Sequence, residues 1–217
     1  MEIKICGLMR RCDVELCEEL GIDLLGFVVE YPREVPWNLT RDRARELIAD
    51  AKRPTCIVTG GTVEKVITLA KELNPKMVQL HFKETVAQTV EIAAELKKSG
   101  IKTVRAVADE SEIEALCRTD IDAILVDSRT SENAATNIQA VDVELFNQIK
   151  MESSKPLIIA GGITPENVCD IVTQTGANRV DVMTGVEQSP GVKDRTKIEL
   201  LVNNRAAIVN QERSRKP

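Results

Sequence analysis

The chain has 217 residues, of which 43% are hydrophobic and 29% are charged, a composition that favours one substantial core over a disordered or fibrous chain. Its formal net charge of -5 and sequence pI of about 5.2 exclude the broad basic surface that nucleic-acid binding requires. Aromatic residues make up only 2% of the chain, so the core must be aliphatic and a base-stacking surface for single strands is excluded as well.

Short apolar runs alternate with longer amphipathic segments along the chain, as expected when crossover helices cover parallel strands. The apolar runs predict eight strands, at residues 3–6, 24–29, 55–58, 77–80, 103–106, 123–126, 157–160 and 180–182. A helical pattern follows each strand, at residues 13–20, 41–51, 63–73, 87–98, 110–116, 143–150, 165–173 and 193–210. Capping residues support these limits, with threonines before three helices and glycines after three: Thr40, Thr62, Thr164, Gly21, Gly100 and Gly176.

Eight strand–helix units of this compactness predict an α/β fold, a single (β/α)8 TIM barrel, rather than an open doubly wound sheet. No linker, low-complexity run or change in composition divides the chain, so we expect residues 1–217 to form one domain. The polar stretch at 128–140 is expected to be an active-site loop, and residues 213–216 a basic terminal tail.

The remaining compositional features concern location and metal binding. The first residues lack a secretory signal, and no run approaches the roughly 20 apolar residues of a membrane span, so we expect a cytoplasmic protein without a membrane partner. The six cysteines form no CxxC pair and are expected to be free thiols. His81 is the single histidine and no cysteines have metal-ligand spacing, so no metal site is expected.

Two titratable residues stand where predicted strands end, the position at which barrel enzymes carry their reacting groups. Cys6 ends the first strand beside Gly7, and Asp127 follows the apolar run at 123–126. A thiol whose pKa falls toward neutrality can serve as a general base, and a carboxyl group as the matching acid. The alternatives are a buried structural cysteine and a loop-capping aspartate.

Glycines also follow two neighbouring predicted strands. Gly161 and Gly162 come after the seventh strand, and Thr184 and Gly185 after the eighth. Backbone amides in such loops commonly bind phosphate in barrels, so these four residues are the predicted phosphate site. Ordinary turn glycines are the alternative interpretation.

Segments spread over nearly the whole chain resemble the phosphoribosylanthranilate isomerase family, barrel enzymes of tryptophan biosynthesis. The matching segments lie at residues 4–7, 26–28, 78–81, 126–127, 160–168, 180–182, 185–187 and 190–194. The resemblance implies an Amadori rearrangement of a phosphorylated aminosugar, in which Asp127 protonates the ring oxygen and Cys6 removes the proton from the second ribose carbon. It implies no cofactor, because the substrate nitrogen supplies the electron sink.

The chain departs from the family at the substrate end. The family has an arginine after a proline in the loop following the second strand, where it pairs with the anthranilate carboxylate, whereas this chain has Trp37 after Pro36. Arg10 or Arg33 is the candidate replacement, since a guanidinium binds a carboxylate through two hydrogen bonds. Trp37 and His81 are further candidate substrate contacts, with a structural hydrogen-bonding role as the alternative for His81.

Other departures concern the neighbouring loops. Residues 131–137 replace the family's glycine-rich loop after the sixth strand, Phe82 replaces the glycine after the histidine, and Met183-Thr184 replaces a serine pair. Three functions therefore stand open: the family's own isomerisation, the same rearrangement of another phosphorylated aminosugar, and ligand binding without turnover. The expected partner is a small phosphorylated aminosugar, and the expected assembly is a monomer or homodimer.

Overall fold

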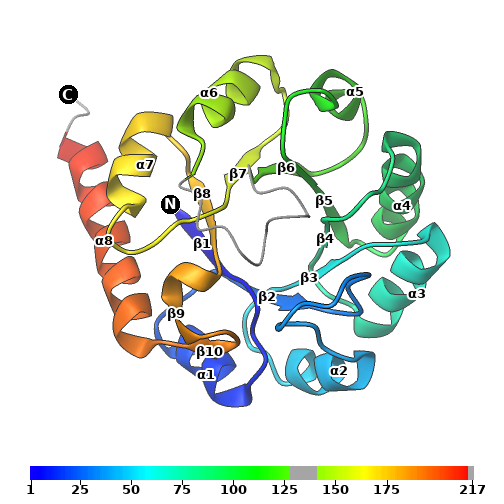
Figure 1. Ribbon diagram of the computed structural model, residues 1–217, viewed down its shortest axis with the longest axis horizontal. Helices are drawn as coiled ribbons and strands as arrows, with labels where there is room; N and C mark the ends of the chain where they lie inside the picture. Colours follow the sequence, from blue (N-terminus) through cyan, green and yellow to red (C-terminus); the bar gives the residue numbers. More distant parts are fainter. Residues whose placement is uncertain (128–140, 215–217) are drawn as a thin grey trace.

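The computed structural model describes residues 1–127 and 141–214, with side chains described as far as residue 208. Eight parallel strands form a closed barrel, and Figure 1 shows the helices arranged around it. The strands are β1 (Glu2–Ile5), β2 (Leu24–Val28), β3 (Thr55–Thr59), β4 (Met77–Leu80), β5 (Lys102–Val107), β6 (Ala123–Val126), β7 (Leu157–Ile159) and β8 (Arg179–Val182). The α-helices of the described residues are α1 (Arg11–Glu19), α2 (Arg41–Ala49), α3 (Val63–Leu73), α4 (Val86–Lys98), α5 (Ile113–Cys117), α6 (Val143–Glu152), α7 (Val168–Thr175) and α8 (Arg195–Ser214).

The barrel closes through β1 and β8, which pair in parallel with Glu2 opposite Arg179 and Ile5 opposite Val182. This pairing is the one feature that separates a barrel from an open sheet, so the predicted TIM barrel is confirmed. All eight predicted strands are present, with ends that differ by at most one residue. The long helix α8 lies between α7 and α1 and completes the outer ring (Figure 1).

Alternation along the strands divides the core into two layers. On β1, Ile3 and Ile5 belong to the large aliphatic layer between strands and helices, whereas Lys4 and Cys6 occupy the alternate positions that face the barrel interior. The interior on the side of β5, β6 and β7 is aliphatic, and its buried side chains are Val104, Ala106, Ala123, Leu125, Ile158 and Ala160.

The helices α5 and α7 begin later than their patterns predicted, because polar side chains bind the preceding backbone. At α5 the Asp109 carboxylate accepts hydrogen bonds from the Ser111 backbone N–H at 2.8 Å and hydroxyl at 2.5 Å, which holds that segment in a turn. Before α7, Asn167 accepts from the Thr164 N–H at 2.8 Å and donates to the Gly162 carbonyl at 2.9 Å. Thr40 and Thr62 cap α2 and α3 as predicted.

The main element that the sequence pattern missed is a hairpin after β8. A 3₁₀ turn (Thr184–Val186) leads into β9 (Glu187–Ser189), which pairs antiparallel with β10 (Val192–Lys193). Lys193, predicted as the first residue of the last helix, instead lies in β10, where its ammonium bonds Glu187 at 2.8 Å. The helix α8 therefore begins at Arg195 and extends to Ser214, which places the first residues of the predicted basic tail inside it.

None of the helices within the described residues is long and apolar enough to cross a membrane. The predicted active-site loop at 128–140, including the replaced glycine-rich segment at 131–137, lies outside the described residues.

Candidate active site

A small cavity opens at the carboxyl ends of the strands, and both predicted proton-transfer residues line it. Its volume is about 90 Å³. The site side chains in its wall come from β1, β4, β6 and β8 or the residues that follow them, and from the loop after β2: Cys6, Trp37, His81, Asp127, Asp181 and Thr184. Residues far apart in the sequence thus meet at one site, as strand-end placement predicts.

Cys6 lies directly after β1, and its backbone N–H donates to the Val182 carbonyl of β8 at 2.9 Å. Gly26 on β2 makes room for it, because a Cβ there would lie 3.0 Å from the Cys6 sulfur and 2.9 Å from its Cα. The thiol is 4% exposed. Burial raises the pKa of the Cys6 thiol above its ordinary value, and the neighbouring Lys4 ammonium opposes that rise. The expected fall toward neutrality is therefore absent, because burial outweighs the nearby positive charge.

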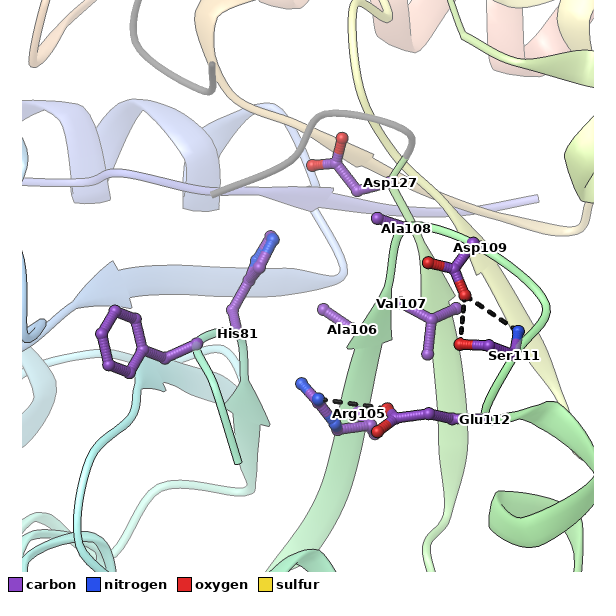
Figure 2. A pocket seen from close by; sticks show the side chains of 10 residues that line it. His81, Arg105, Ala106, Val107, Ala108, Asp109, Ser111, Glu112 and Asp127 are labelled. Atoms are coloured by element: carbon purple, nitrogen blue, oxygen red, sulfur yellow. Dashed lines mark hydrogen bonds and ion pairs between the residues drawn. The ribbon is translucent and has the colours of Figure 1, made fainter. Parts of the chain in front are cut away.

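Asp127 follows β6. Its backbone N–H donates a hydrogen bond to the Val107 carbonyl of β5 at 3.0 Å, which fixes its position. Its side chain is nearly buried but lines the cavity of Cys6 and also a second cavity of about 300 Å³. The second cavity extends along the end of β5, and Figure 2 shows Asp127 and His81 at its opening with Arg105 pointing away from Asp127 toward Glu112. Since both cavities share His81 and Asp127, they adjoin at the barrel mouth.

A hydrogen-bond network crosses the barrel interior beneath this opening. The Lys4 ammonium donates to Asp181 Oδ2 at 2.7 Å and to Gln79 Oε1 at 3.0 Å, and Gln79 Nε2 lies 3.1 Å from His81 Nδ1. Because Lys4 fixes which end of the Gln79 amide is the acceptor, the amide nitrogen must donate to His81 Nδ1. In neutral His81 the proton then sits on Nε2, an inference from the network rather than an observed hydrogen.

The sequence analysis did not single out Lys4, Gln79 or Asp181 as functional residues. Each is a polar residue inside a short, otherwise apolar strand, at a position that alternates with the residues facing the helices. That placement was the available signal, because a polar side chain in a barrel interior needs a partner across the barrel.

The two predicted phosphate loops meet at the same end of the barrel. A Cβ on Gly185 would lie 1.9 Å from the Ile163 carbonyl oxygen, so the loop after β8 packs directly against the loop after β7. Gly161 and Gly162 have φ values of 88° and 60°, in the left-handed region that strongly favours glycine. Thr184 lines the cavity with Cys6. The structure thus brings all four residues to one corner of the site.

Trp37 is buried at the rim of the cavity, where it forms a hydrogen bond that the sequence did not predict. Its indole N–H donates to Glu187 Oε1 at 2.9 Å, and the same oxygen accepts from Lys193 at 2.8 Å and from the Gly191 N–H at 3.2 Å. Glu187 and Lys193 belong to the hairpin after β8, so this hairpin holds the indole in place.

The two candidate arginines lie in different surroundings. Arg10 forms two hydrogen bonds with the buried carboxylate of Asp13, at 2.6 and 2.8 Å, and is not part of the cavity wall. The Arg33 guanidinium lies over the Phe82 ring, 5.7 Å from its centroid, and Phe82 lines the second cavity beside His81. Of the two, Arg33 is the one brought to the barrel mouth.

Within residues 1–127 and 141–214, no group of three or more His, Cys, Asp or Glu side chains is placed to hold a metal ion. The expectation that neither metal nor cofactor takes part stays a prediction. All six cysteines are free thiols.

Comparison with known proteins places this chain in a family. Residues 3–204 match the family model described as N-(5'-phosphoribosyl)anthranilate (PRA) isomerase. The N-(5'-phosphoribosyl)anthranilate isomerase of Haloferax volcanii is 31% identical over 205 residues, covering 92% of this chain and 90% of that protein. The crystal structure of phosphoribosyl anthranilate isomerase from Thermotoga maritima superposes with a TM-score of 0.80 at 26% identity, covering 95% of this chain and 99% of the other.

A further crystal structure of the isomerase holds reduced 1-(o-carboxyphenylamino)-1-deoxyribulose 5-phosphate, with a TM-score of 0.77, 26% identity, and coverage of 95% and 99%. The family match spans the strands that carry Cys6, Asp127 and the four phosphate-loop residues. The chain belongs to the N-(5'-phosphoribosyl)anthranilate isomerase family.

Proposed function

We propose that the chain carries out the family's isomerisation with Asp127 as general acid and Cys6 as general base. The observation that carries the proposal is that these two residues, from β1 and from the end of β6, line one cavity together with Thr184 of the phosphate loops. A substrate bound by its phosphate at the loops after β7 and β8 would extend its sugar between the two groups.

The reaction then proceeds in two proton transfers. Asp127 gives its proton to the ribose ring oxygen as the bond from that oxygen to the first carbon breaks, which leaves an iminium ion at the substrate nitrogen. The Cys6 thiolate takes the proton from the second carbon, and the electron pair of that C–H bond neutralises the iminium. The resulting enol-amine becomes the aminoketose, and proton exchange with solvent restores the acid and the thiolate.

The phosphate is assigned to Gly161, Gly162, Thr184 and Gly185. The tight contact of the two loops at Gly185 and the left-handed backbone at Gly161 and Gly162 support this assignment, because backbone amides can approach an anion only where side chains do not intervene. A relative crystallised with a phosphorylated product analogue supports the same class of ligand.

For the anthranilate end we favour Arg33 over Arg10 as the carboxylate partner. Arg33 lies against Phe82, which lines the second cavity beside His81, whereas Arg10 lies outside the walls of both cavities. Trp37 and His81, both in the cavity wall, would contact the ring and the sugar.

One observation favours a second candidate substrate. The family's carboxylate-binding arginine is replaced by Trp37, whose indole is fixed by Glu187 and makes this rim of the cavity apolar together with Val35. The same rearrangement of a phosphorylated aminosugar without the anthranilate carboxylate would suit that rim.

The test is consumption of N-(5'-phosphoribosyl)anthranilate by the purified protein, followed through loss of the substrate's fluorescence. We expect turnover, with Cys6→Ser and Asp127→Asn each reducing kcat about 100-fold to 10,000-fold while the fold is retained. Cys12→Ser and Asp120→Asn, at exposed positions, are the matched controls and should turn over normally.

Two results would contradict the proposal in different ways. No consumption at high enzyme concentration, with turnover of an aminosugar phosphate that lacks the carboxylate, would establish the second candidate substrate. Normal turnover of anthranilate substrate by either site variant would remove the role assigned to that residue. The six free thiols suit the reducing cytoplasm in which we expect the enzyme to work, and its oligomeric state stays a prediction of monomer or homodimer.

A further inference from the structure

Two buried charges inside the barrel, beneath Cys6, have no role in the proton transfers proposed above. Lys4 and Asp181 occupy paired positions on β1 and β8, and their ion pair is nearly closed to solvent, with side-chain exposures of 4% and 7%. A buried ion pair contributes little to stability, because removing two charges from water costs about as much as their attraction returns. A role in the site is therefore the better explanation for keeping these two charges.

The placement of Lys4 connects it with the thiol. Lys4 and Cys6 are two residues apart on one strand, so both side chains face the barrel interior. A Cβ on Gly26 would lie 3.0 Å from the Cys6 sulfur and 3.0 Å from Lys4 Cε, so the two side chains border the same gap. Burial raises the pKa of the Cys6 thiol, and the positive charge of the neighbouring ammonium lowers it.

We propose that Lys4 is the positioning residue of the base: held by Asp181 and Gln79, its ammonium stabilises the Cys6 thiolate. An ammonium has three N–H donors. Asp181 and Gln79 accept two of them, and these bonds hold the ammonium beside the gap that Lys4 shares with Cys6. The inference rests on the proposed function, because it explains how a buried thiol can serve as the base.

Asp181 has two opposing effects on this arrangement. Its carboxylate keeps Lys4 charged: burial alone would lower the pKa of Lys4, but Asp181 and the nearby cysteines raise it above its ordinary value. The same negative charge raises the pKa of the Cys6 thiol, in addition to the larger effect of burial. Lys4 and Asp181 should therefore shift the titration of Cys6 in opposite directions.

Besides Lys4 and Asp181, several titratable groups lie on the elements that pack around Cys6. Tyr31 follows β2 and lines the same cavity. The remaining groups are Cys56 of β3, His81 after β4, Asp127 after β6 and Lys193 of β10. Lys193 also lowers the pKa of the thiol, but its ammonium is bound to Glu187 at 2.8 Å, and Lys4 has the larger effect.

The test measures the thiolate directly, without substrate. The rate at which iodoacetamide alkylates Cys6 is followed against pH, with the Cys6 peptide quantified by mass spectrometry, in the full-length protein and in Lys4→Met, Asp181→Asn and the control Lys97→Met. Lys97 is an exposed lysine paired with Asp120. The acidic limb of kcat/KM against pH provides the second measurement.

We expect Lys4→Met to move both midpoints to higher pH by at least about one unit, which lowers each rate about tenfold below the midpoint. Asp181→Asn should move them to lower pH, and Lys97→Met should leave them unchanged. If Lys4→Met fails to fold, Lys4→Met/Asp181→Asn removes both charges of the pair, and its midpoint should lie above that of Asp181→Asn.

Unchanged midpoints in the Lys4 variants, or shifts of Lys4→Met and Asp181→Asn in the same direction, would overturn the inference. Failure of the proposed function would look different. If Cys6→Ser turned over normally while Lys4→Met still shifted the alkylation midpoint, Lys4 would stabilise the thiolate of a cysteine that is not the base.

Discussion

The two halves of the barrel interior differ in what they contain. The half formed by β5, β6 and β7 is filled by aliphatic side chains such as Val104, Leu125 and Ile158, whereas the half formed by β1, β4 and β8 contains Lys4, Gln79 and Asp181. Both halves are equally buried. Burying aliphatic surface stabilises a fold by about 25 cal/mol per Å², while burying an ion pair returns little or nothing. One half of the interior therefore supports the fold, and the other supports the site.

The polar half continues upward into the groups that line the cavity. Gln79 connects to His81, and Lys4 lies beside Cys6. On the aliphatic side, and among the described residues, only Asp127 beyond the end of β6 brings a titratable group from those strands into the cavity of Cys6. The base thus follows β1 at the barrel closure, and the acid follows β6 on the aliphatic side.

The largest expected effect tests the aliphatic half. Leu125→Ala removes a fully buried side chain from the barrel interior and leaves a cavity among close-packed neighbours, so we expect a loss of about 2 to 5 kcal/mol in the free energy of unfolding. Urea denaturation measures the loss. Per folded molecule, kcat/KM should change little, because Leu125 carries no group of the site. A large fall in kcat/KM with unchanged stability would contradict the assignment of fold support to one half and site support to the other.

The second prediction concerns the polar half and has the opposite sign. Lys4→Met/Asp181→Leu replaces the ion pair by apolar side chains of similar size, and such replacements of buried pairs are neutral or stabilising by about 1 to 4 kcal/mol. The free energy of unfolding should therefore stay the same or rise, while turnover falls because the thiolate loses its counter-charge. Lys4→Met alone is the control and should be destabilised, since it leaves the Asp181 carboxylate buried without its partner. A strongly destabilised double variant would mean that the pair supports the fold after all.

The strands of both halves were predicted equally well, each within one residue at either end. Strand positions followed from apolar runs and helix starts from threonine caps, because both depend on neighbouring residues alone. The late starts of α5 and α7 depend on where the Asp109 and Asn167 side chains bond, which a helical pattern does not reveal.

For the site, the strand-end rule placed Cys6 and Asp127 correctly in one cavity. It could not find the Lys4–Asp181 pair, whose members are 177 positions apart and meet only because β1 closes on β8. The hairpin after β8 was missed for a similar reason. Its polar strands have no apolar periodicity, and Glu187 shows its role only once Trp37 and Lys193 are seen to share its oxygen.

The smallest expected effect concerns the edge of the polar half, where Trp37 meets Glu187. Trp37→Phe keeps an aromatic ring at the cavity rim and removes the indole N–H that donates to Glu187 Oε1 at 2.9 Å. Glu187 retains Lys193 and the Gly191 N–H, so no buried charge loses its last partner. A hydrogen bond to a charged group contributes about 1.5 to 3 kcal/mol, and because Glu187 keeps two other donors we expect a loss in unfolding free energy at the lower end of that range. Glu187→Gln in the wild-type background is the comparison, and it should cost more, because it removes the charge that balances the buried Lys193 ammonium. If Trp37→Phe instead raised KM strongly while stability stayed unchanged, the indole N–H would be a substrate contact and its bond to Glu187 would be secondary.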